Sequence, residues 1–250
     1  WIACLVMQLF GGLWFLSQRA TEPAPHPRRP QRAGEEAEGT GGAAEGTAHD
    51  SAGLRPVLRY GAVGAVVVVF LISGAMFGAN DVAAVAFATE AGHKSASGLV
   101  LAVWGVGSFI AALLYGSRAW GWPLWKQFMV GLVGLAVGAS TFSLAPNLVV
   151  LSALALMTGL AIAPTLTSGN NIIQVTVAPS QLTEGLAWVS TALNVGVSVG
   201  SLLAGQAADA GGSRAVYLAV AGFAWAAVVA GIVGLSALKR ARTTRGLTSQ

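Results

Sequence analysis

The sequence has little charge and almost no cysteine. Of its 250 residues, 10% are charged and 54% are hydrophobic, whereas a soluble domain carries about 25% charged residues. This composition excludes a soluble globular enzyme and indicates a protein with several membrane spans. The single cysteine, Cys4, excludes a disulfide within the chain, a Cys-based metal site and a CxxC redox pair.

Several motifs of catalytic and ion-binding sites are also missing. The sequence has no HExxH zinc motif, no Walker A lysine motif and no TVGYG filter. His26 and His49 lie in a polar segment and His93 lies in a predicted loop. We therefore expect no enzyme activity, no cofactor and no metal site. The basic residues flank apolar runs and form no soluble patch, so we expect no nucleic-acid partner.

Residues 18–56 form the one long polar segment. They contain no Phe, Trp, Tyr, Val, Ile or Met, and they hold five of the nine prolines and six of the ten acidic residues. Such a composition cannot offset the entropy lost on ordering, so it predicts a disordered linker. The apolar residues 1–17 precede it without an initiator Met or a basic n-region. We expect them to be the end of a transmembrane helix that begins before this chain. A processed N-terminus is the alternative.

Six apolar runs follow the linker, and we expect each to be a transmembrane helix. Backbone groups in lipid must pair internally, and these runs lack the alternation of barrel strands. They span 58–89, 95–117, 125–145, 147–177, 183–208 and 214–238. The predicted fold is an all-α membrane protein, with a six-helix transmembrane bundle over 57–238 and a cytoplasmic tail over 239–250.

The lysines and arginines divide unevenly between the two sides of this bundle. Twelve of them fall on the side that holds the linker, the loops 118–126 and 178–182, and the C-terminus, whereas Lys94 and Arg214 fall on the other. The positive-inside rule then places the linker and C-terminus in the cytoplasm, for a multi-pass protein of the cytoplasmic membrane. An interfacial aromatic belt is predicted from Trp120, Trp122 and Trp125.

Polar side chains recur at helical spacing on the fourth and fifth runs. An interrupted helix is typical of a transporter site, and Pro164 interrupts the fourth run just before these residues. Side-chain amides in hydrocarbon must face protein or water. Two interpretations stay open, a solute cavity or hydrogen bonds between helices, and for the serines we favour the second. The candidate substrate-binding residues are Thr167, Asn170, Asn171, Gln174, Asn194 and Ser198.

Two further features stand out within the runs. Asp81 is the one acidic residue with apolar sequence on both sides, whereas Glu90, Glu184 and Asp209 fall at helix ends, where solvation is the default. An intramembrane carboxylate indicates function, so Asp81 is our candidate for binding a coupling proton or cation. A solvated carboxylate at the outer interface is the alternative. The Gly196-x-x-x-Gly200 spacing permits close packing of two helices.

The order of these elements resembles the second half of a major facilitator superfamily transporter. The segments FGANDVAAVAFATEAG, LLYGSRAWGW, GLAIAPTLTSGNN and QLTEGLAWVSTALNVGVSVGSLLAGQAADAGG are similar to those of actinobacterial members. The resemblance implies that the six helices are helices seven to twelve, of which seven, eight, ten and eleven line the cavity or its gates. One departure lies at 116–121, GSRAWG, where the family's loop signature has an Asp before the Arg. A charge-relay gating role for this loop is therefore in doubt.

This resemblance implies a secondary active transporter that works by alternating access. Efflux of a drug-like or sugar-like molecule is the commonest theme of the family. The implied partners are a small-molecule solute, the lipid bilayer and a preceding N-terminal six-helix half. A non-transporting scaffold or receptor of the same fold is the alternative function.

Overall fold

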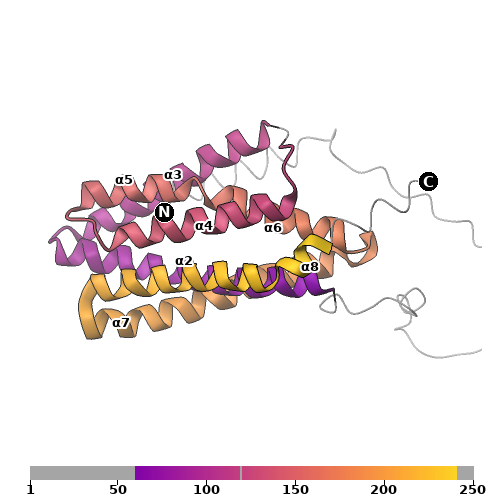
Figure 1. Ribbon diagram of the computed structural model, residues 1–250. Helices are drawn as coiled ribbons and strands as arrows, with labels where there is room; N and C mark the ends of the chain where they lie inside the picture. Colours follow the sequence, from indigo (N-terminus) through magenta and orange to yellow (C-terminus); the bar gives the residue numbers. More distant parts are fainter. Residues whose placement is uncertain (1–59, 119, 241–250) are drawn as a thin grey trace, which may run out of the picture. The chain divides into compact units, whose positions relative to one another are not determined.

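The computed structural model describes residues 60–118 and 120–240. In this part the chain forms helices and no strand, which confirms the predicted all-α fold class (Figure 1). The predicted helix end at 1–17, the linker at 18–56 and the tail beyond residue 240 lie outside the described residues. The elements in chain order are α2 (Gly61–Glu90), η3 (Lys94–Ala96), α3 (Ser97–Gly116), α4 (Leu124–Phe142), α5 (Leu148–Gly159), α6 (Ile162–Thr176), η4 (Pro179–Gln181), α7 (Leu182–Val233) and α8 (Leu235–Arg240).

Four helical stretches of the described part are long and apolar enough to cross a membrane, judged by length and composition. They are Gly61–Glu90, Lys94–Gly116, Leu148–Thr176 and Pro179–Val233. The sequence analysis predicts six crossings. It treats the last stretch as two helices, and it counts α4 as a further crossing. Lys126 and Gln127 near the start of α4 lower the mean hydropathy of that helix.

Helix α2 lies at the centre of the packing. It contacts both halves of α7 and also meets α3, α6 and α8. Val63, Val66 and Val69 are completely buried. Phe70 stacks on Phe128 of α4 with ring centroids 6.4 Å apart. The aliphatic and aromatic run that predicts a membrane span thus also provides the bundle with its core.

Helix α7 breaks at Gly211 and Gly212, and the chain reverses there (Figure 1). Gly212 has φ +66° and ψ −166°, a backbone conformation that is essentially restricted to glycine. We name the two parts the first arm, residues 182–210, and the second arm, residues 213–233. They correspond to the predicted fifth run and most of the sixth.

Glu90, at the end of α2, caps the second arm. Its carboxylate accepts hydrogen bonds from the backbone N–H of Ser213 at 2.7 Å and from the Ser213 hydroxyl at 2.5 Å. A carboxylate at a helix N-terminus satisfies a free N–H group and complements the helix dipole. The prediction that Glu90 is merely a solvated helix end is therefore incomplete, because the chain reversal brings Ser213 to it.

Glycines hold α2 and the first arm at backbone contact. Gly196 and Gly200 on the arm face the backbone of α2, and Gly74 and Gly78 on α2 face the backbone of the arm. A methyl group at any of the four would overlap a backbone carbonyl of the opposite helix. The Gly196-x-x-x-Gly200 spacing thus has a matching Gly74-x-x-x-Gly78 spacing across the crossing, an arrangement that lets two membrane helices pack closely.

A second crossing of this kind joins α3 and α5. Gly107 faces the backbone of Leu156 and Gly159, and Gly159 faces the carbonyl of Trp104. Together the two crossings fix the first arm against α2, and α5 against α3.

The interruption of the fourth predicted run lies one turn before Pro164. Helix α5 ends at Gly159, and α6 begins at Ile162, so Pro164 lies inside the first turn of α6. A proline has no N–H for the carbonyl four residues earlier and its ring crowds that turn, whereas it is tolerated at a helix start. The break therefore falls at Leu160 and Ala161.

Candidate functional site

The predicted polar stripe lies on the accessible face of α6. Thr167 and Gln174 are exposed, and Asn170 and Asn171 are half-buried. Ile172, which points away from most of these side chains, is 2% exposed and belongs to the core. The helical spacing that suggests a stripe thus corresponds to one side of the helix, turned away from the packed interior.

None of these four polar side chains has a hydrogen-bond partner among the residues that the structure describes. The buried polar residues of α6 behave differently. Thr165 and Ser168 donate to the carbonyls of Ala161 and Pro164, each at 2.6 Å. Their hydroxyls are therefore satisfied within the helix, whereas the four side chains of the stripe have no partner in the described part of the chain.

The first arm of α7 has a similar exposed polar sector. The Asn194 amide donates to the carbonyl of Ser190 at 2.8 Å, and the Ser198 hydroxyl donates to the carbonyl of Asn194 at 3.1 Å. All three residues are exposed. In the described part, these side chains bond within their own helix. No hydrogen bond there joins Asn194 to the α6 amides.

Asp81 lies on the face of α2 between α3 and the first arm. Residues three and four positions apart share a helix face. Phe77, four residues earlier, packs edge-to-face on Trp104 of α3 with centroids 5.6 Å apart, and Gly78 faces the arm. Asp81 is exposed, its neighbour Asn80 is buried, and no described cation forms an ion pair with the carboxylate. The Asp81 carboxylate is thus accessible on the face of α2 that lies between α3 and the first arm.

Trp104 has a donor without an acceptor. Its indole N–H is buried and has no hydrogen-bond partner in the described part of the chain, although a buried indole N–H usually finds one. The sequence did not indicate this position, because a single Trp inside an apolar run is equally compatible with packing. The structure places it against Phe77, one turn from Asp81.

A polar cluster joins three helices at the end of the bundle where α3 ends and α4 begins. The Tyr115 hydroxyl donates to the Gln127 side chain of α4 and lies 3.0 Å from the Ser168 hydroxyl of α6. The Gln127 amide in turn donates to the carbonyl of Trp122 at 2.6 Å. This cluster was not predicted. Through the Trp122 carbonyl it anchors the loop between α3 and α4.

Two arrangements typical of enzymes can be compared directly with the described residues. The described residues contain no group of three or more His, Cys, Asp and Glu residues that could hold a metal ion. The GVSVG stretch at 196–200 has the GxSxG spacing of a hydrolase nucleophile, but it lies within a continuous helix. A nucleophile elbow requires a sharp turn from a strand to a helix, so Ser198 does not have that role.

Comparison with known proteins agrees with this description. A family model, the Major Facilitator Superfamily, matches residues 66–249. No curated protein and no solved structure matches the chain. The matched region covers most of α2 and all the helices that follow, including the polar faces of α6 and the first arm. This chain belongs to the Major Facilitator Superfamily, a family of multi-pass membrane transporters.

Proposed function

We propose that this chain forms one wall of the central cavity of a secondary active transporter, and that the α6 stripe contacts the solute. The observation that carries the proposal is the set of four polar side chains on α6 that have no partner among the described residues. Amide groups in a membrane require protein or water as partners. A cavity between two rocking halves supplies water and solute in turn.

The residue types of the stripe favour a neutral or weakly charged polar solute. Asparagine and glutamine side chains offer both donors and acceptors. Neither α6 nor the first arm contains a Lys or Arg that would pair with a strong anion. We propose efflux of a drug-like or sugar-like molecule, in line with the commonest theme of the family. The contact residues are Thr167, Asn170, Asn171, Gln174, Asn194 and Ser198.

We propose that Asp81 binds the coupling proton or cation. Its position at the boundary of α3 and the first arm, exposed and without a described ion-pair partner, supports this role. The other wall of the cavity belongs to a preceding six-helix half. In this arrangement the exposed sides of α2, α6 and the first arm face that half.

The cytoplasmic membrane is the proposed location, with the linker and the C-terminus in the cytoplasm. The ends of the bundle support this orientation. At one end, the ammonium groups of Lys126 and Lys239 both lie near the indole of Trp125. At the other end, Arg214 follows the Ser213 that bonds to Glu90. Protease added to inside-out vesicles should cut within 18–56, and cutting only in right-side-out vesicles would reverse the topology.

The experiment that tests the solute site is cysteine scanning of residues 165–176 in a Cys4→Ala background. Water-soluble thiol reagents should label positions 167, 171 and 174, and substrate should block the labelling. The matched controls are 172 and 173, which are buried in the core on the same helix. Equal labelling of the stripe and the controls, or no labelling at all, would mean that the stripe is not a solute surface.

A further inference from the structure

Basic and aromatic side chains gather where α4 meets α8. The ammonium group of Lys126 lies 5.5 Å from the ring centroid of Trp125, and that of Lys239 lies 4.9 Å from the same centroid. Both ammonium groups therefore lie beside the same indole ring. The guanidinium of Arg118 lies 5.7 Å from the ring centroid of Trp120 in the adjoining loop.

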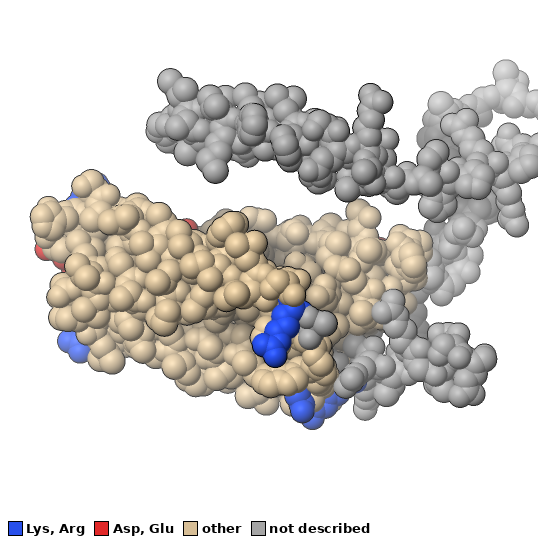
Figure 2. All heavy atoms as spheres, turned by 90° about the horizontal axis from the view of Figure 1, so that it is seen from above, with Lys and Arg blue, Asp and Glu red and all other residues tan. Residues whose placement is uncertain are grey.

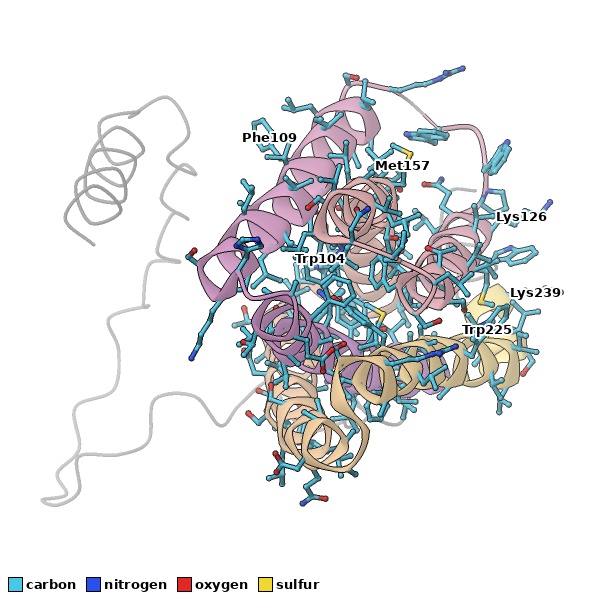
Figure 3. All side chains as sticks on the ribbon, turned by 90° about the vertical axis from the view of Figure 1, so that its left-hand side faces the viewer. Trp104, Phe109, Lys126, Met157, Trp225 and Lys239 are labelled. Carbon is cyan, nitrogen blue, oxygen red and sulfur yellow. The ribbon has the colours of Figure 1, made fainter. Side chains whose placement is uncertain are left out.

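These cations have no anionic partner among residues 60–118 and 120–240. Neither lysine forms an ion pair or a hydrogen bond with another residue in the described part of the chain. In the view down the bundle, Lys126 and Lys239 project from the same side (Figure 3). Two like charges beside one indole, with no ion-pair partner among the described residues, make a site that is complementary to an anion.

An apolar hollow lies beside Lys126 and Trp125, the indole that Lys239 also contacts. It has a volume of about 480 Å³ and is lined by Trp122, Trp125, Lys126, Met129 and Val130. Val130, one turn further into α4 than Lys126, is 58% exposed. The surface thus passes from cationic to aromatic to aliphatic over the first two turns of α4. Charged side chains are few on the face of the molecule that Figure 2 shows.

We propose that this hollow binds an anionic phospholipid, with its phosphate between Lys126 and Lys239 and an acyl chain along Met129 and Val130. The indoles of Trp122 and Trp125 lie at the level of the glycerol backbone, where aromatic belts occur. Basic pockets at the ends of membrane helices attract anionic lipid head groups. A soluble anion would use the lysines but would gain nothing from the apolar hollow. The site involves α4 and α8 and is separate from the polar faces of α6 and the first arm.

The test measures lipid binding to the full chain in detergent by native mass spectrometry. Phosphatidylglycerol should bind more tightly than phosphatidylcholine. With each basic residue near the surface contributing about fivefold, Lys126→Gln/Lys239→Gln should weaken phosphatidylglycerol binding by about 25-fold. The matched control is Lys94→Gln/Arg214→Gln, which removes the same charge from the opposite end and should change the affinity by less than about twofold.

Two further measurements separate this site from general attraction and from misfolding. Lys126→Arg/Lys239→Arg keeps the charge and should retain the affinity for phosphatidylglycerol. Inorganic phosphate at millimolar concentration should not displace the lipid, because it lacks the acyl chain. Equal loss of binding in the glutamine variant and the control, or loss in the arginine variant, or displacement by phosphate, would each overturn the proposal.

Discussion

The glycine crossing between α2 and the first arm gives the sharpest stability prediction. At Gly200 an added methyl group would overlap the backbone of Ala75, and at Gly196 it would overlap the carbonyl of Leu71. Backbone atoms on a packed helix cannot turn away as a side chain does. Gly200→Ala therefore forces the two helices apart or distorts one of them.

The magnitude follows from two opposing effects. Overpacking of a well-packed interior costs about 1–3 kcal/mol, whereas replacing glycine by alanine inside a helix gains up to about 1 kcal/mol. Gly222 on the second arm isolates the second effect, because a methyl group there meets nothing within 4 Å. We expect Gly200→Ala to be less stable than Gly222→Ala by about 1–3 kcal/mol.

Thermal unfolding in detergent, followed by tryptophan fluorescence, measures this difference. For a chain of this size, 1 kcal/mol corresponds to a shift of about 2–4 °C in Tm. Gly200→Ala should therefore melt about 2–12 °C below Gly222→Ala. Gly196→Ala should behave like Gly200→Ala, because it lies in the same crossing. Equal melting temperatures for all three variants would refute close backbone contact at this crossing.

Three further predictions concern single side chains. Glu90→Ala removes the cap at Ser213 and should lower stability by about 1 kcal/mol, whereas Asp209→Ala, at the exposed end of the first arm, should change it little in the same melting assay. Tyr115→Phe removes the hydroxyl that donates a hydrogen bond to the Gln127 side chain, and it should lower stability by about 1–2 kcal/mol. An unchanged Tm would exclude the cluster from the folded state. Asp81→Asn should reduce or uncouple transport in a vesicle assay without loss of expression, while Glu184→Gln should not; wild-type activity and pH dependence in Asp81→Asn would leave Asp81 as a solvated carboxylate.

The general architecture could be predicted from the sequence because a bilayer leaves few choices. Long apolar runs must form helices in lipid, so composition and run length suffice to give the all-α membrane class. The α6 stripe was predictable for a related reason. Its members recur at helical spacing, and the structure places them on one accessible face. The arrangement of the runs and their segments also resembles the family that the comparison identifies.

The exact position of the helix break was harder to predict from the sequence. A proline predicts that a helix is interrupted, but its effect acts on the carbonyl one turn earlier. The structure accordingly places the break at Leu160 and Ala161 and leaves Pro164 within α6.

Contacts between segments far apart in the sequence could not be predicted from the sequence. The hydrogen bond that the Ser213 N–H donates to Glu90 joins residues 123 positions apart, and it depends on how the chain reverses at Gly212. The Tyr115 hydroxyl likewise reaches Ser168, 53 positions away. Spacing along one helix contains no information on which residues of another helix it meets. For the same reason, Gly196 and Gly200 were noted as a packing motif without their partners Gly74 and Gly78.

The two glycine crossings also bear on how the proposed transporter would move. Interlocked backbones resist sliding, because each helix would drive its carbonyls into the other. Helix α2 and the first arm should therefore move as one body, as should α3 and α5. In the proposed transporter, Asp81 and the polar sector of the first arm would then keep a fixed spacing while their helices turn relative to the preceding half. Rigid-body rocking about a midplane site requires such a fixed spacing, and the glycines that provide it lie where α2 meets the helix that carries Asn194.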